Sequence, residues 1–495
     1  TNSVLRNLGS FVMRTNGVYG ATGITAAAVT QQMRLMEFLY GPYMVQPGAP
    51  QITVFQISVD DSFADPVEDS QTSVVAYNAS QGVIQPTNTV RRNTFGASVD
   101  CCADFAVVGA PGADVNGSDS GTALIYRLVP GTTNTWTQWR QLQPASIDAN
   151  DKFGQAVSMS QDLVAVGAIQ DEVNSSAVGA VYIFQRDTGG SNNWGQVTRI
   201  APTNLPASSQ FGFSVDLDGD LLAVGAPKAT LSGASPAVGA VFLFGRNKGG
   251  PNAWGEIMRW EPAGQASTDF GWSVSLSGDH LIVGAPSNKS PLPSGTPLGA
   301  AYFLSRHAGG TDKWGQVQRI VVDSFTLPVD FGISVSVDRD ILAIGAPKVT
   351  LDDIFESGQV FVYQRSSESN WWNVVASLDE RDLWNSRFGH SVSVNKDFIF
   401  VGAPGYWDIY LPGKCYLYRR DSTTSGDWTR VERFISPDSQ NYLAYGKTVS
   451  FKCGTAIVGA PPSDLAPLNI YGKAYMYRFK FDNAPTVADP VPDQY

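Results

Sequence analysis

Apolar and polar positions follow one another in short runs along this chain, and the same order of runs returns many times. One example has an alternating run over 211–216, a continuous apolar run over 221–224, a third run over 239–244 and a second alternating run over 254–260. Alternation with a period of two predicts strands, and the continuous run predicts a strand buried on both faces. Asp- and Gly-rich stretches between the runs predict tight turns. Each unit is therefore expected to be a four-stranded antiparallel sheet.

Two short motifs mark the beginning and the middle of each unit. An aromatic-Gly pair recurs at a nearly constant interval, at Phe95, Phe153, Phe211, Phe270, Phe331, Phe388 and Tyr445. A Gly-Ala pair follows each aromatic at the same distance in all seven units, at Gly109, Gly167, Gly225, Gly284, Gly345, Gly402 and Gly459. A Pro follows Gly-Ala in six units, and the second unit has Ile169 in its place. One such sheet cannot bury both of its faces alone, so seven repeats predict an all-β, seven-bladed β-propeller.

The seventh unit lacks its fourth run. In units one to six, a Trp stands at nearly the same distance before the next aromatic-Gly pair, as Trp136 stands before Phe153, whereas the segment 479–495 contains no Trp. The same distance counted back from Phe95 leads to Asn78, next to a strand-like run over 81–85. An open sheet edge is a liability. We therefore expect the segment before the first unit to supply the last strand and to close the ring.

The expected organisation follows from these boundaries. It comprises a short N-terminal extension with one helix (1–50), strands that include the closing strand (51–94), the propeller (95–480) and a C-terminal tail (481–495). Helical spacing of apolar residues predicts the helix over 25–40, and 51–59 is strand-like. These pieces are too small to fold alone. Either they pack on the propeller or they form an arm that docks on a neighbouring subunit.

Composition narrows the class of partner. The formal net charge is −11 and only 16% of the residues are charged. Binding to nucleic acid or to an anionic membrane surface needs clustered Lys and Arg, so neither is expected. No stretch approaches the eighteen or so consecutive apolar residues of a transmembrane helix, so no transmembrane segment is expected.

The Phe-Gly and Gly-Ala-Pro motifs over 95–480 resemble the FG-GAP repeats of the integrin α-subunit propeller and its extracellular relatives. The resemblance implies an extracellular or cell-surface protein that serves adhesion or binds a protein or other ligand. The fold alone does not specify the function, because it hosts adhesion, lectin-like and enzymatic members. Two alternatives stay open: a structural subunit that polymerises through its N-terminal arm, and a glycan-binding lectin.

The chain departs from integrin-type repeats where those often carry a calcium loop, between the first and second strands. The corresponding hairpins are too short here to supply the six to eight oxygens that calcium prefers. We therefore expect no cofactor and no metal. The one calcium candidate is a looser acidic cluster with Asp114, Asn116 and Asp119.

Catalysis is not expected either. Nucleophilic catalysis usually needs a His near the nucleophile, and His280, His307 and His390 lie in no recognisable motif with Ser or Asp. Acidic residues such as Glu380 are expected to be solvated loop charges.

Recognition is expected on the loops between second and third strands and between blades, which share one face of a propeller. The first kind varies in length, and variable loops on a regular scaffold commonly carry recognition. Aromatic side chains are typical interface anchors, although these could also fold back on their own blades. The candidate ligand-binding residues are Tyr406, Trp407, Asp408, Tyr410, Asp352, Asp353 and Phe355.

The cysteines and glycosylation motifs bear on the compartment. Cys102 and Cys453 lie in equivalent hairpins of the blades that meet at ring closure, so we predict a disulfide between them, with Cys101 as the competing partner. Cys415 is expected to be a buried thiol. N-x-[ST] motifs fit a secreted glycoprotein. They make glycosylation candidates of Asn78, Asn116, Asn174 and Asn288.

Overall fold

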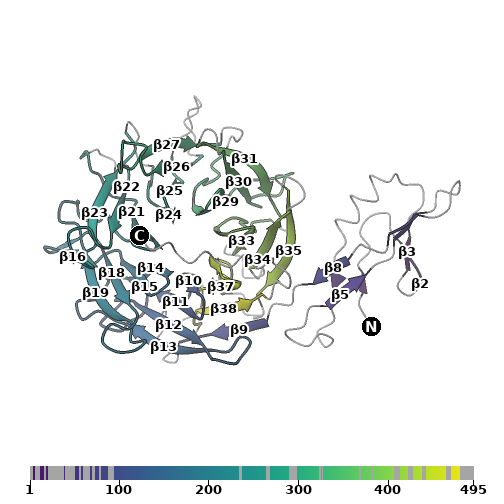
Figure 1. Ribbon diagram of the computed structural model, residues 1–495, viewed down its shortest axis with the longest axis horizontal. Helices are drawn as coiled ribbons and strands as arrows, with labels where there is room; N and C mark the ends of the chain where they lie inside the picture. Colours follow the sequence, from purple (N-terminus) through teal and green to yellow (C-terminus); the bar gives the residue numbers. More distant parts are fainter. Residues whose placement is uncertain are drawn as a thin grey trace. The chain divides into compact units, whose positions relative to one another are not determined.

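The computed structural model forms a ring of seven antiparallel sheets around one axis (Figure 1). It describes residues 80–86 and 94–479 of this ring and eight short strands before it. The gaps within the ring are 234–236, 264–267, 289–297, 323–324, 326, 367–369, 382–383, 406–412, 422–426, 437–441, 464–465 and 467–469. The predicted seven-bladed β-propeller is confirmed, and the described residues contain no helix.

Each blade has four strands that follow one another from the axis outward. The first blade comprises β10 (Ser98–Cys102), β11 (Phe105–Ala110), β12 (Thr122–Leu128) and β13 (Trp136–Leu142). The second comprises β14 (Phe153–Ser160), β15 (Leu163–Ala168), β18 (Ala180–Gln185) and β19 (Gly195–Ile200), with a small hairpin of β16 (Glu172–Val173) and β17 (Ser176–Ala177). The third comprises β20 (Ser214–Asp218), β21 (Leu221–Ala226), β22 (Ala240–Gly245) and β23 (Gly255–Trp260). The fourth comprises β24 (Ser273–Ser277), β25 (His280–Ala285), β26 (Ala300–Ser305) and β27 (Gly315–Ile320).

The remaining blades repeat this order. The fifth comprises β28 (Ser334–Asp338), β29 (Ile341–Ala346), β30 (Gln359–Arg365) and β31 (Trp372–Leu378). The sixth comprises β32 (Ser391–Asn395), β33 (Phe398–Ala403), β34 (Lys414–Arg420) and β35 (Trp428–Ile435). The seventh comprises β36 (Thr448–Lys452), β37 (Thr455–Ala460), β38 (Lys473–Arg478) and β9 (Ser80–Ile84). We call the face with the second-to-third-strand loops and the blade connections the loop face, and the opposite face the hairpin face.

Strand β9 closes the ring, as its place in the repeat predicts. It pairs antiparallel with β38, with Ile84 opposite Ala474, so the first and last parts of the ring lie side by side in Figure 1. Blade one fastens this strand from the other side: the Tyr126 hydroxyl donates to the Gln85 carbonyl at 2.9 Å. The amide of Asn134 donates to the Met476 carbonyl at 2.9 Å.

The recurring motifs are contacts between neighbouring blades. The Gly of each Gly-Ala pair lies against the carbonyl of the aromatic-Gly pair in the next blade, so that a Cβ at Gly225 would overlap the Gly271 oxygen. The residue three positions after the aromatic donates a hydroxyl hydrogen bond to the same carbonyl. For example, Ser214 Oγ donates to Gly271 O at 2.9 Å. Equivalent bonds come from Ser98, Ser273, Ser334, Ser391 and Thr448. The aromatic rings themselves are fully buried between blades.

The N-terminal strands form a separate compact unit with the end of the chain, residues 1–79 and 482–495. Four pairs are described: β1 (Val4–Leu5) with β4 (Phe38–Leu39), β2 (Val12–Thr15) with β3 (Val18–Gly20), β5 (Gln51–Val54) with β8 (Ser73–Ala76), and β6 (Ile57–Val59) with β7 (Val67–Asp69). Among the described residues, no helix is long and apolar enough to span a membrane.

The helix predicted over 25–40 is wrong at its end, because Phe38–Leu39 is a strand; residues 25–37 lie outside the described residues. Spacing could not decide, because a short apolar run fits a strand as well as a helix. The segment 51–59 forms two strands with different partners rather than one.

Deletion of residues 1–92 removes β9 and leaves β38 as an open edge. We predict a loss of about 10 °C or more in melting temperature, or insolubility. Deletion of residues 1–79 is the matched control, because it keeps β9. Thermal unfolding of both proteins measures the difference. Equal melting temperatures for the two deletions would show that β9 does not hold the ring together.

Candidate functional site

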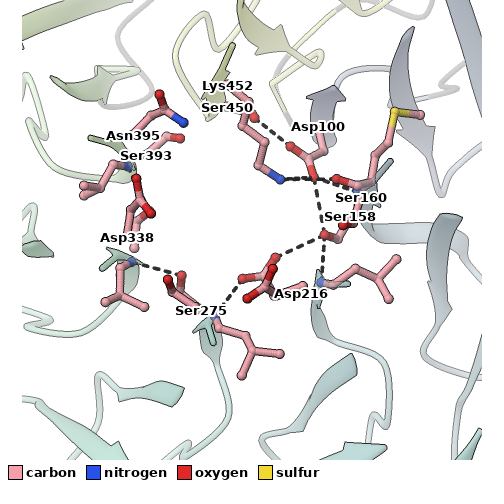
Figure 2. Close-up of a pocket in the computed structure, with 18 of the residues that line it drawn as sticks. Asp100, Ser158, Ser160, Asp216, Ser275, Asp338, Ser393, Asn395, Ser450 and Lys452 are labelled. Carbon is pink, nitrogen blue, oxygen red and sulfur yellow. Dashed lines mark hydrogen bonds and ion pairs between the residues drawn. The ribbon is translucent and has the colours of Figure 1, made fainter. Parts of the chain in front are cut away.

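A cavity of about 340 Å³ lies on the axis, lined by the first strands of the seven blades (Figure 2). Its volume is within the range of small-molecule sites. The position five residues after each aromatic is polar in every blade and faces this cavity. These seven residues are Asp100, Ser158, Asp216, Ser275, Ser336, Ser393 and Ser450.

Most of these polar side chains bind the next blade. Ser158 Oγ accepts from Leu217 N at 3.0 Å, and Asp216 Oδ2 accepts from Leu276 N at 2.8 Å. The bonds made by Ser275, Ser336 and Ser393 are equivalent. Two residues further on, Ser160, Asp218, Ser277 and Asp338 each accept a backbone N–H from the next blade's hairpin. The cavity wall is therefore a seam that joins the blades.

The seam contains an ion pair where blade seven meets blade one. Ser450 Oγ donates to Asp100 Oδ1 at 2.6 Å, and Lys452 Nζ donates to Asp100 Oδ2 at 2.8 Å. Met159 N of the second blade also donates to Asp100 Oδ2, at 2.7 Å. Asp100 thus joins three blades, and Lys452 is the only cation among the described residues that line the cavity.

Burial also affects the ionisation of the cavity wall. Desolvation raises the pKa of Asp216 to about 6, an effect that the positive charge of Lys452 partly offsets. The negative charge of Asp100 raises the pKa further. A carboxyl whose pKa is higher in the folded than in the unfolded chain favours the folded state when it is protonated.

Asp216 should therefore make the propeller more stable as pH falls from 7 towards 5, because the folded state takes up the proton first. We predict that Asp216→Asn reduces this gain, because the amide cannot take up a proton. Melting temperatures of wild type and variant, measured at pH 7 and pH 5, test the prediction through their difference. Parallel pH dependence of the two proteins would contradict it.

A second set of side chains, one from each blade, stands two residues after each aromatic, at the loop-face end of the first strand. Phe213 and Trp272 of blades three and four pack with their aromatic rings 4.6 Å apart between centroids. His390 Nε2 and Lys447 Nζ of blades six and seven are 3.1 Å apart. The full set is Ala97, Gln155, Phe213, Trp272, Ile333, His390 and Lys447.

The three histidines lie in different surroundings. His280 packs against the rings of Phe303 and Trp372, and burial lowers its pKa. His307 Nδ1 accepts from a backbone N–H at 2.9 Å in its own hairpin. In the described part of the chain, none of the three histidines is hydrogen-bonded to a hydroxyl, thiol or carboxylate.

On the loop face, the predicted residue Phe355 is 47% exposed, so it does not fold back on its blade. Asp352 pairs with Arg381 of the connection to blade six, and Asp353 is exposed. Trp384 in the same connection is 63% exposed. The other candidates, Tyr406, Trp407, Asp408 and Tyr410, lie outside the described residues.

Trp384 was not among the residues predicted from the sequence. The signal was its position, four residues before the aromatic-Gly pair, where three of the other six units have Ala and none has another aromatic. The equivalents in units one to five are Ala149, Ala207, Ala266, Leu327 and Trp384.

In the calcium candidate, the side chains of Asp114 and Asn116 form hydrogen bonds with nearby backbone groups. Asp114 Oδ1 accepts from Asp119 N at 2.8 Å, and Asn116 Nδ2 donates to Ile147 O at 3.3 Å. No group of three His, Cys, Asp or Glu side chains suited to a metal ion occurs in the described ranges.

Burial corrects two expectations from the sequence, the glycosylation of Asn288 and the solvation of Glu380. Asn288 is fully buried, its amide donates to the Tyr302 hydroxyl at 3.0 Å, and Arg319 donates to its carbonyl. A glycan cannot be accommodated there in the folded protein. Glu380 is not a solvated loop charge, because it accepts from the Tyr418 hydroxyl at 2.6 Å and pairs with Arg430 at 2.5 Å.

The other three glycosylation candidates differ in accessibility. Asn116 and Asn174 are exposed, whereas the side chain of Asn78 lies outside the described residues.

All four cysteines are free thiols in the structure, and the Cys102–Cys453 disulfide stays a prediction. Burial raises the pKa of Cys101 to about 12, and its Sγ lies 3.8 Å from Ser450 Oγ. Burial also raises the pKa of Cys415. Burial is likewise the main cause that raises the pKa of the partly buried Cys102, and the charge of the exposed Cys453 raises it further.

We predict that mild oxidation joins Cys102 to Cys453 and spares Cys101, because only a thiolate attacks and the Cys101 thiol is buried with a high pKa. Mass spectrometry of unreduced peptides identifies the bridge. Cys453→Ser is the control that should remove it. Finding Cys101 in a bridge, or Cys453 still free after oxidation, would refute this pairing.

The repeats of this chain are similar to a known family. The family model described as FG-GAP repeat matches residues 80–126, 136–184, 194–244 and 261–304. The chain is a seven-bladed β-propeller with FG-GAP repeats in four places. The first three matches run from the outer strand of one blade to the third strand of the next, and the fourth begins directly after the outer strand β23. The first match therefore begins with the closing strand β9.

No curated protein sequence matches this chain. Among solved structures, a crystal structure of Saccharomyces cerevisiae Sqt1 is similar over 79% of this chain and 97% of that chain, with 10% identity and a TM-score of 0.40. A similarity this low carries no information about a ligand.

Proposed function

We propose that this FG-GAP propeller is a non-enzymatic, extracellular module that binds a protein ligand through its loop face. The observation that carries the proposal is one backbone framework that presents different side chains in different blades. In blade one, Asn150 N donates to Ser118 O at 2.8 Å, and in blade five, Asn385 N donates to Phe355 O at 2.8 Å. The next two backbone bonds also correspond, and they reach Phe153 and Phe388.

The exposed side chains on this common framework differ. Blade one presents Ser118 and Ala149, whereas blade five presents Phe355 and Trp384. Small polar or short side chains suit a solvated surface, and large exposed aromatics suit an interface. Variation confined to one surface of a uniform scaffold is typical of recognition.

Other features support a binding protein over an enzyme. The axial cavity has its polar groups engaged in blade-to-blade hydrogen bonds. The FG-GAP repeats suggest an extracellular setting, as in the integrin-like proteins that they resemble. The separate N-terminal unit favours one alternative, a subunit that polymerises through this unit.

Amine cross-linking of the protein in its natural source, followed by mass spectrometry, tests the proposal. The loop face carries Lys228 and Lys447, and the hairpin face carries Lys248, Lys313 and Lys396, all of them exposed. We predict that cross-links to a different protein come from the loop-face lysines.

Two results would argue against this function. Cross-links to another protein from the hairpin face alone would exclude the loop face as the binding surface. Cross-links between copies of this chain, together with light scattering that grows with concentration, would favour the polymer.

A further inference from the structure

We propose that Phe355 and Trp384 anchor a docking site for a protein segment with basic residues around an apolar centre. We call this site the blade-five patch: Phe355 and Trp384 with the surrounding Asp352, Asp353 and Asp379. The inference rests on the proposed function, because it places the ligand at one sector of the loop face. It adds the location of the site and the chemistry of the partner.

The two aromatics are exposed although their backbones are fixed. Asn385 N, next to Trp384, donates to the Phe355 carbonyl at 2.8 Å. Arg387 N donates to the Glu356 carbonyl at 3.1 Å, and the side chains of the same two residues pair at 2.9 Å. Before the aromatic pair, Arg381 pairs with Asp352, so the loop and the blade connection are joined on both sides of the pair. Anchors that are fixed before binding lose little conformational entropy when a partner binds.

The backbone of the loop is held in an uncommon conformation. Asp352, Asp353 and Glu356 have φ angles of 46°, 65° and 48°. Non-glycine residues seldom adopt this left-handed region, and it persists only where the surroundings impose it. Here the short turn and the hydrogen bonds to the next connection impose it. The result is that Phe355 is presented to solvent.

The charges around the aromatics define the partner. Asp352, Asp353, Glu356 and Asp379 carry four negative charges, and Arg381 and Arg387 carry two positive charges, which leaves a net charge of −2. Arg381 already pairs with Asp352 and Asp379, and Arg387 pairs with Glu356. Asp353 has no ion-pair partner within the described residues. A basic segment would complement this rim and would also be attracted by the whole chain, with its formal net charge of −11.

Blade one supplies the matched comparison within the same chain. It has the equivalent backbone bonds, but Ser118 and Ala149 stand where blade five has Phe355 and Trp384. The framework therefore does not need the aromatic side chains. The double variant F355S/W384A copies the side chains of blade one into blade five, and it should fold as the wild type does.

The experiment begins with selection of binders to the full chain from a phage-displayed library of random short peptides. We expect the selected peptides to contain Lys or Arg next to aromatic or aliphatic residues. Their affinity should fall by about tenfold or more in F355S/W384A, since interface anchors typically carry effects of this size. Affinity for the wild type should also fall as salt is raised, because salt screens the acidic rim.

Trp371→Ala is the control, because Trp371 is 50% exposed but lies at the hairpin-face end of the same blade. Its binding should match that of the wild type. Equal melting temperatures of wild type and F355S/W384A establish that the double variant is folded.

Other results with these variants would contradict the patch, and one of them would also contradict the loop face. If Trp371→Ala loses binding and F355S/W384A does not, both the patch and the loop face are wrong. If neither variant changes binding, but Val115→Asp on the loop face of blade one does, the patch is wrong and the proposed function stands.

Two outcomes concern the partner's chemistry. Selected peptides without basic residues, binding independently of salt, or no selected peptides at all, would overturn the basic partner. Binding of a glycan from a printed array that is lost in F355S/W384A would keep the patch and replace the protein partner by a carbohydrate.

Discussion

The whole ring depends on how closely two backbones approach at each blade boundary. The Gly of the Gly-Ala pair in one blade faces the carbonyl of the aromatic-Gly pair in the next, as Gly167 faces Gly212 and Gly345 faces Gly389. A side chain at either first glycine would overlap that carbonyl. Because every boundary repeats this contact, the two motifs must keep the same separation in every unit. The constant distance between them along the chain is thus a consequence of packing between blades.

Closure adds a requirement that the other boundaries lack. Six boundaries join consecutive segments of chain, whereas the seventh joins the two ends of the ring. Strand β9 completes the last sheet, and Asp100, Ser450 and Lys452 replace the simpler hydrogen bonds that serve elsewhere on the axis. A buried charge is retained only when it is paired and hydrogen-bonded. Asp100 satisfies this condition by accepting from Lys452, Ser450 and Met159.

The sequence was most informative where the structure depends on interactions between nearby residues that recur in every unit. Strand runs, turns and the position of the missing strand follow from spacing alone, so the blades and the closing strand β9 could be predicted. Asn288 and Glu380 could not, because the partners that bury them come from other strands: Tyr302 for Asn288, Tyr418 for Glu380. Trp384 stands at a position that could have been compared between units, but its exposure depends on how the connection packs.

The hydrogen bonds on the axis also favour the loop face as the place of the proposed recognition. At the cavity, the polar side chains accept backbone N–H groups from neighbouring blades, so changing them for a ligand would weaken the ring. On the loop face, blades one and five share the same backbone bonds, and these bonds coexist with Ser118 in blade one and with Phe355 in blade five. Side chains there can vary without loss of the fold. If the proposed binding is right, a propeller of this type changes its ligand through the loop face while it keeps its axis.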